Sequence, residues 1–260
     1  MYKKLTPLKQ SDHGKLRLLP ITDYGFARSE LVAPIVIDEI ADVAREYPIV
    51  FPVGSGLPVA LMGLEKDSNA YVSVDGQWLA TYIPAHIRHY PLALTPIPGE
   101  AQPPADNGTA AADKRFVVLV DMASACISQQ LGDAVFDAEG QLTGSAQQKM
   151  RIMEMMQNRV DATQQLVKAI DGAGLLLERA IRIKREGEPD RQVTGIRVID
   201  EAALNKLDDA AFNTLRRSGA LPLVYASLLS WANFRQGAIG KTHPLPAPVP
   251  ALGDEVIRYN

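Results

Sequence analysis

Short apolar runs separated by turn-forming residues fill the stretch from Tyr47 to Leu92, and this stretch constrains the fold more than any other. Ile49–Phe51 is one run and Val59–Met62 is the next, and the two prolines and two glycines between them limit the length of any strand. Asp75-Gly76 follows a third run, and both residues tolerate the positive φ angles of a tight turn. The stretch therefore predicts a β-sheet region with a hairpin at Asp75-Gly76.

A long amphipathic helix is predicted in the second half of the chain. Apolar residues recur every three or four positions between 145 and 171, and Gly172 and Gly174 follow as a stop signal. Four methionines lie within the single segment from Met150 to Met156. Because methionine packs against irregular partners, this cluster indicates either core packing, which we favour, or an adaptable binding surface.

Apolar runs and capping residues predict the shorter elements. Pro84 and Pro91 leave room for one or two helical turns, which would place His86 and His89 on one face. The other predicted elements are a strand near Leu16–Leu19, a helix over Asp38–Arg45 capped by Asp38, a buried strand over Phe116–Val120, strands over 175–184 and 192–200, and helices begun by Asp200, by Asp208 or Asp209 with Gly219 as C-cap, and by Pro222.

The order of these elements predicts an α+β fold, with a mainly antiparallel sheet in the first half and a helix-richer second half. Residues 96–113 are rich in Pro, Ala and Gly and form the expected loop. Residues 1–95 are the sheet-rich region, and residues 114–240 are a mixed strand and helix region of the same or a second domain. Residues 241–260 hold too many prolines for a core element and are expected to form a tail.

Composition and charge exclude several classes of protein. The net charge of −3 gives no global reason to expect nucleic acid or an anionic membrane as the partner. The single cysteine, Cys126, excludes an intrachain disulfide framework. No window approaches 18 apolar residues, and no apolar segment follows the basic residues near the start. We therefore expect a cytoplasmic protein without a membrane span.

Several motifs of the central stretch together resemble one known family. The residues that carry the likeness are Tyr47–Phe51, Ala60–Leu64, Asn69, Asp75–Trp78, Tyr82–Ala85 and Ile87–Pro91. They are similar to the SapC family, bacterial proteins named for a surface-layer gene cluster, and the likeness continues to Asn233. The resemblance implies a role near outer-surface biogenesis, with flavin-dependent halogenase-like and TonB-dependent receptor genes as frequent neighbours. Family members often carry Arg-Arg at Arg88-His89 and Cys at Val120, which argues against fixed catalytic groups there.

Known catalytic motifs are absent from the sequence: it holds no GxSxG, Walker A, HExxH or CxxC pattern. His86 and His89 have the spacing of a metal pair, but a solvated basic turn is favoured, so no metal and no cofactor is predicted. Asp121 ends a predicted buried strand, where α/β enzymes often place a catalytic acid. A capping or turn-forming carboxylate is the favoured alternative. Cys126 has no neighbour in sequence that would lower its pKa and is interpreted as a small core residue.

A later segment of the chain resembles the turn at Asp75-Gly76. Ala134–Leu142 resembles Val74–Trp78 in its apolar, acidic and Gly-Gln pattern. The echo indicates either a repeated hairpin unit or two ordinary turns.

The central stretch also gathers aromatic side chains and arginine, which is the composition of a recognition surface. The predicted binding residues are Tyr47, Phe51, Asn69, Trp78, Tyr82, Arg88, His89 and Tyr90. The alternative is that these aromatics only cover the core. We therefore predict a non-enzymatic accessory protein that resembles SapC and binds a protein or peptide, with a homo-oligomer also open. The alternative function is an enzyme acting on a peptide or small molecule beside a redox partner such as a flavin-dependent halogenase, with Asp121, Arg88 and His89 as its candidate groups.

Overall fold

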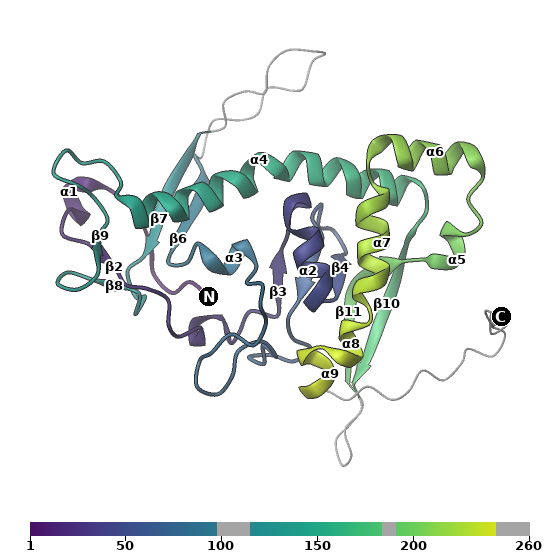
Figure 1. Ribbon diagram of the computed structural model, residues 1–260, viewed down its shortest axis with the longest axis horizontal. Helices are drawn as coiled ribbons and strands as arrows, with labels where there is room; N and C mark the ends of the chain where they lie inside the picture. The colour runs from purple at the N-terminus through teal and green to yellow at the C-terminus, as the bar shows by residue number, and fades with distance from the viewer. Residues whose placement is uncertain (98–114, 184–190, 243–260) are drawn as a thin grey trace.

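The computed structural model describes residues 1–97, 115–183 and 191–242 as an elongated molecule (Figure 1). One long helix, α4 (Gly144–Gly172), runs along one side of it over much of its length. Antiparallel sheets and helices both contribute to the packed interior, and most helices follow α4 in the chain. The predicted α+β fold and the long helix are confirmed.

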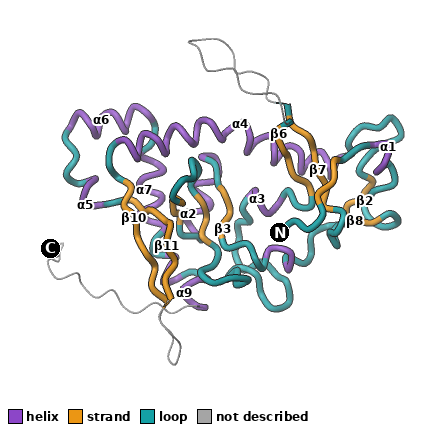
Figure 2. Tube along the Cα trace, turned by 180° about the vertical axis from the view of Figure 1, so that it is seen from behind, coloured by secondary structure: helices purple, strands orange, loops and turns teal. Residues whose placement is uncertain are grey.

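The strands, orange in Figure 2, form three sheets. Every strand pair in these sheets is antiparallel. The largest sheet has the order β10 (Leu176–Ile183), β11 (Arg191–Ile199), β4 (Ile49–Pro52), β5 (Val59–Leu61), β3 (Val32–Pro34). The second has the order β1 (Leu5–Pro7), β7 (Phe116–Asp121), β6 (Leu92–Pro96), and the third the order β8 (Ile127–Ser128), β2 (Arg17–Leu18), β9 (Asp133–Ala134).

Helix ends follow the predicted capping residues in the last third of the chain. Asp200 accepts a hydrogen bond from the backbone N–H of Ala203, Asp208 accepts one from Ala211, and Gly219 has φ +78°. The remaining helices are α1 (Gln10–His13), α2 (Ile40–Glu46) after a 3-10 turn (Ile37–Glu39), a 3-10 turn (Gly25–Ala27), α3 (Ala85–Arg88), α5 (Glu201–Leu204), α6 (Asp209–Ser218), α7 (Leu221–Ser230), α8 (Asn233–Gln236) and α9 (Ala238–Thr242).

One local prediction is wrong, because the polar group finds another partner. Asp38 does not cap the first predicted helix: its carboxylate pairs with Arg159 of α4 at 2.9 Å.

The predicted hairpin at Asp75-Gly76 is present in a short form. One isolated antiparallel bridge joins Val72 to Trp78, and the N–H of Leu79 donates a 2.9 Å hydrogen bond to the carbonyl oxygen of Tyr71. The pairing does not extend further, because the N–H of Ala70 donates to the carbonyl oxygen of Met62 and those of Thr81 and Tyr82 donate to the Glu46 carboxylate.

The turns that contain Gly76 and Gly140 share one geometry. In 71–79 and in 135–143, a backbone hydrogen bond of 2.9 Å joins the last residue to the first, and one bridge lies inside it. The side chain that opens each turn accepts a bond from the N–H group four residues on, at 2.9 and 2.7 Å. Gly76 and Gly140 have φ near +80°, a conformation that favours glycine. Each segment is therefore a short turn of the same geometry with a single antiparallel bridge.

The buried apolar residues form two clusters, and α4 contributes to both. The larger cluster joins the five-stranded sheet to α2, α7 and the second half of α4. The smaller cluster joins β2, β6 and β7 to the first half of α4, through Ala146 and Met153. Strand β7 is central in its sheet, but only Val120 and Asp121 are buried, so the expectation of a wholly buried strand is wrong. An apolar run does not reveal how far a small core extends.

Some expectations fall on residues outside the described ranges. These are most of the loop 96–113, the polar turn between β10 and β11, and the tail beyond Thr242. Within the described ranges, each helix is too short or too polar to cross a lipid bilayer.

Candidate functional site

A cavity of about 370 Å³ lies between the segment that follows β2 and the turn that precedes β8. Tyr90 and Cys126 are buried at its base, whereas Asp23 and Ala125 are exposed at its rim. An apolar hollow with a few polar groups is the usual form of a site that receives a small ligand or a side chain. Its lining residues are Leu19, Pro20, Thr22, Asp23, Gly25, Phe26, Tyr90, Ala125 and Cys126.

Stacked aromatic rings fix one wall of the cavity. The rings of Phe26 and Tyr90 are nearly parallel, with centroids 3.9 Å apart. Tyr24 continues the row, 6.0 Å from Phe26 and 5.4 Å from Trp78, and Tyr2 packs on the other side of Tyr90 at 5.6 Å. Ring contacts of this kind add about 0.5–1.5 kcal/mol each beyond simple burial. The wall is therefore held in place before any ligand arrives.

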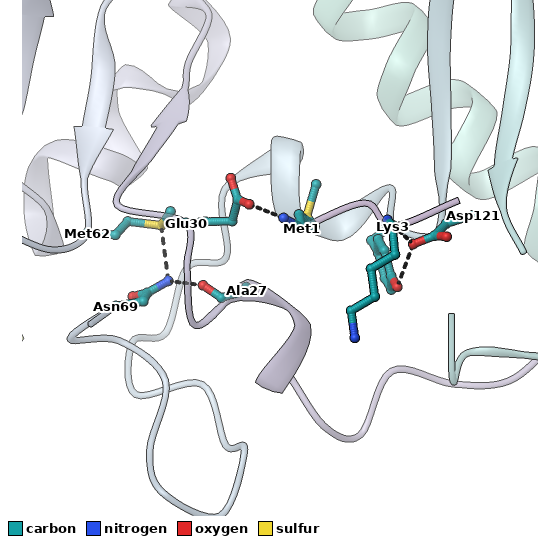
Figure 3. A network of polar contacts seen from close by, with 8 residues as sticks. Met1, Lys3, Ala27, Glu30, Met62, Asn69 and Asp121 are labelled. Carbon is teal, nitrogen blue, oxygen red and sulfur yellow. Dashed lines mark hydrogen bonds and ion pairs between the residues drawn. The ribbon is translucent and has the colours of Figure 1, made fainter. Parts of the chain in front are cut away.

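The hydroxyl of Tyr90 connects the cavity to a buried carboxylate, Asp121. The oxygens of Asp121 accept hydrogen bonds from the backbone N–H groups of Lys3, Lys4 and Ala123 at 2.8 to 3.1 Å, and Figure 3 shows the contact with Lys3. The Tyr90 hydroxyl donates a further bond at 3.3 Å. Asp121 thus ties the start of the chain, the end of β7 and the cavity wall to one another.

These contacts set the charge of Asp121. Burial alone raises the pKa of its carboxyl, but the bonds from the N–H groups of Lys4, Lys3 and Ala123 outweigh burial and hold the pKa below its ordinary value. The group is therefore ionised at neutral pH, with its oxygens already engaged. Of the two interpretations that the sequence left open, the contacts support a turn-forming carboxylate.

His86 of α3 and His89, which follows α3, are neutral at pH 7. Burial lowers the pKa of His86 and of His89 to about 4, and for His89 the neighbouring His86 adds to the effect. Their rings meet edge to face at 5.5 Å. The Nδ1 atom of His89 lies 2.8 Å from the carbonyl oxygen of Leu92 and 3.1 Å from the Tyr2 hydroxyl. No group of three His, Cys, Asp or Glu side chains within the described ranges is placed to hold a metal ion.

A second polar cluster joins Glu39 and Tyr82 to Arg88 of α3. The Tyr82 hydroxyl donates a 2.8 Å hydrogen bond to Glu39 and accepts one of 3.1 Å from Arg88, whose guanidinium lies over the Tyr82 ring. The backbone N–H of Ala85 donates a 2.7 Å bond to the same Glu39 oxygen. Burial raises the pKa of Glu39 although these bonds oppose the shift. The Nε atom of Arg88 is buried without a hydrogen-bond partner in the described part of the chain.

The other predicted binding residues hold the interior together. Phe51 is fully buried in β4, and the hydroxyl of the buried Tyr47 accepts a 2.8 Å bond from Trp78 Nε1. Asn69 donates to the carbonyl oxygen of Ala27 and contacts the sulfur of Met62, as Figure 3 shows. Tyr90 is the one predicted binding residue that lines the cavity. Three of the other seven are half-buried: Trp78, Tyr82 and Arg88.

The family model for SapC matches residues 8–236 of the 260-residue chain. The chain belongs to the SapC family. Comparison with curated proteins and with solved structures finds no match. The matched range includes the whole lining of the cavity, Asp121 and the Glu39 cluster, so the candidate site lies inside the part of the chain that makes it a SapC family member.

Sequence reasoning missed all of the cavity lining except Tyr90 as binding residues of this SapC family chain, and it missed Glu39. Phe26 forms the cavity wall, and Glu39 is a carboxylate with only 1% of its surface exposed. The segment that holds Phe26 carries an aromatic-glycine-aromatic signal, but nothing local shows that it meets Tyr90. Cys126 lines the cavity as a thiol whose pKa burial raises, in keeping with an inert small side chain.

Proposed function

We propose that the chain is a non-enzymatic binding protein whose cavity receives an apolar side chain of a protein or peptide. The observation that carries the proposal is the preformed hollow beside the Phe26–Tyr90 stack, with Asp23 at its rim. A cavity of about 370 Å³ lies near the lower end of the range of roughly 300–1,000 Å³ for ligand pockets, and one apolar side chain can enter it. The family resemblance supports a place in bacterial surface biogenesis or peptide modification, and we propose a cytoplasmic location.

The state of the candidate catalytic groups supports binding over the alternative enzyme. Asp121 is engaged by backbone N–H groups, and His89 is neutral with Nδ1 at a carbonyl oxygen. Arg88 stacks on Tyr82 on the side of the Glu39 cluster. General acid-base catalysis needs a group within reach of a substrate and with a pKa near the working pH. These contacts favour structural roles for Asp121 and His89.

The proposal is tested by closing the cavity from its rim. Ala125 is exposed and lines the hollow, so Ala125→Trp fills the mouth without disturbing the core. Ala202→Trp, at an exposed position of α5 away from the cavity lining, is the matched control. Tagged full-length wild type and both variants are used to purify companions from the native host, with quantitative mass spectrometry of proteins and peptides.

We expect wild type and Ala202→Trp to retain equal amounts of a companion protein or peptide. The amount retained by Ala125→Trp should be lower by about tenfold or more, as for loss of a central anchor pocket. Equal retention by all three proteins would overturn the proposal. A companion small molecule whose conversion is measurable with the purified chain would favour the enzyme instead.

A further inference from the structure

Helix α7 (Leu221–Ser230) buries its two serines and exposes two large side chains, a leucine and a tyrosine. Its two serines, Ser227 and Ser230, are fully buried, whereas Leu229 has 75% and Tyr225 has 45% of its surface exposed. A surface helix normally turns its polar residues to water and its apolar residues to the core. Among the described residues, nothing covers the outward face of α7, which is therefore an exposed apolar strip.

The buried serines explain how this orientation is held. Ser230 Oγ accepts a 2.9 Å hydrogen bond from the backbone N–H of Ile49 in β4, and Ser227 Oγ donates a 3.2 Å bond to the carbonyl oxygen of the same residue. Leu223 and Val224 pack on the same inward side. The helix is thus fixed to the sheet through its polar groups and cannot turn Leu229 inward without breaking both bonds.

The outward strip is continuous along the helix. Pro222, Tyr225 and Leu229 are spaced by three and four residues and are all exposed, and the exposed Ala232 follows at the same spacing. We define these four residues as the α7 strip. Tyrosine and leucine side chains on a rigid helix lose little conformational freedom when they bind a partner.

The segment of the chain that contains the α7 strip carries charge of one sign. Residues 210–242 contain no Asp or Glu, but they contain Arg216, Arg217, Arg235 and Lys241, in a chain whose net charge is −3. The two arginines at the end of α6 precede the strip and are exposed, and Arg235 follows it and is exposed. Basic side chains therefore stand beyond both ends of the strip.

We propose that the α7 strip binds an acidic, apolar segment of a partner protein. Apolar side chains of that segment would cover Tyr225 and Leu229, and its carboxylates would meet Arg216, Arg217 and Arg235. A second copy of this chain fits less well, because antiparallel two-fold packing of α7 would set arginines against arginines. A lipid surface also fits less well, because membrane-bound helices bury a longer row of large apolar side chains than the two found here.

The test is selection from a random-peptide display library on the full-length protein. We expect the selected peptides to combine Asp or Glu with aliphatic or aromatic residues. Leu229→Ser should weaken binding of a selected synthetic peptide by about tenfold, as for a central contact residue. Leu131→Ser, which removes a leucine of similar exposure (68%) from the β8–β9 turn, is the matched control and should bind as wild type does. Combined Arg216→Glu, Arg217→Glu and Arg235→Glu should reverse the preference to Lys- or Arg-bearing peptides.

Selected peptides without acidic enrichment, or equal binding by Leu229→Ser, would overturn the inference. The inference would also be overturned if wild type formed a dimer that Leu229→Ser dissociates. Binding to phosphatidylglycerol vesicles that depends on Leu229, without binding to the peptide, would overturn it as well. The α7 strip is separate from the cavity, so Ala125→Trp should leave peptide binding unchanged. The two proposals can therefore fail independently.

Discussion

The backbone N–H of Lys4 donates a 2.8 Å hydrogen bond to the carboxylate of Asp121, which lies 117 positions further along the chain. The same carboxylate receives the Tyr90 hydroxyl, so one buried charge fixes both the start of the chain and a wall of the candidate cavity. Strand β1 also pairs with β7 at this point, with Leu5 opposite Asp121. The cavity is therefore shaped by a contact between distant segments.

Replacing Asp121 by asparagine should lower the free energy of unfolding by about 2–3 kcal/mol at pH 7, because hydrogen bonds to a buried charge are lost. The pKa of Asp121 is lower in the folded state than in the unfolded state. The carboxylate therefore contributes to the free energy of unfolding above its ordinary pKa of about 3.9, and this contribution is lost as pH falls through the folded-state pKa. Urea unfolding of wild type and Asp121→Asn across this range should show the difference narrowing below about pH 4. Asp75→Asn, at an exposed turn, is the control, and an equal loss there would contradict the prediction.

Glu39 should show the opposite pH dependence. Its pKa is raised in the folded state, so its contribution is full below the ordinary pKa and is lost as pH rises through the folded-state value. Wild type should therefore lose stability relative to Glu39→Gln as pH rises above about 4.3, the ordinary pKa of glutamate. Chemical unfolding of both proteins between acidic and neutral pH measures this difference. A difference that stays constant with pH would show that folding does not shift the pKa of Glu39 and would contradict the prediction.

Glu39→Ala separates the hydrogen bonds from the charge. The substitution leaves the N–H of Ala85 and the hydroxyl of Tyr82 without their acceptor, and each buried unpaired group costs about 1–3 kcal/mol. We expect a clearly larger loss of stability than for Glu39→Gln. Similar losses for the two variants would mean that neither bond contributes.

Local patterns predict the elements whose ends are fixed by neighbouring residues. Asp200 and Asp208 cap their helices and Gly219 ends α6, because capping needs only groups three or four positions apart. The period of α4 is also local. These parts of the α+β fold follow from the sequence alone.

The candidate site is different, because its partners are far apart in sequence. Nothing near Phe26 indicates that its ring stacks on Tyr90, and nothing near Asp121 indicates that Lys4 will meet it. Asp38 is a good capping residue by type, but a distant arginine, Arg159, takes its carboxylate. Tertiary contacts therefore override local preference where the site is built.

Lys149 should make stability rise at alkaline pH. Its ammonium donates to the carbonyl oxygens of Arg88 and Tyr90, at 3.0 and 2.6 Å, and burial lowers its pKa to about 8. The folded chain therefore releases this proton before the unfolded chain does, and stability grows as pH rises from about 8 toward the ordinary pKa of about 10.4. Wild type should gain this increment relative to Lys149→Met in unfolding measurements over that range. Parallel pH profiles for the two proteins would contradict the prediction.

Ser230→Ala tests whether the buried serines hold α7 on the sheet. The substitution removes the acceptor for the backbone N–H of Ile49, and a buried N–H without a partner costs about 1–3 kcal/mol. Ser218→Ala at the end of α6, where the exposed hydroxyl only donates to the carbonyl of Leu215, should cost well under 1 kcal/mol. Denaturant unfolding compares the two variants directly. Both bonds to Ile49 also fix which face of α7 meets solvent. Relative to wild type, Ser230→Ala should therefore increase the hydrogen-exchange rates of the α7 amides more than those of the α6 amides. An equal increase in the two helices would mean that apolar packing alone sets the orientation of α7.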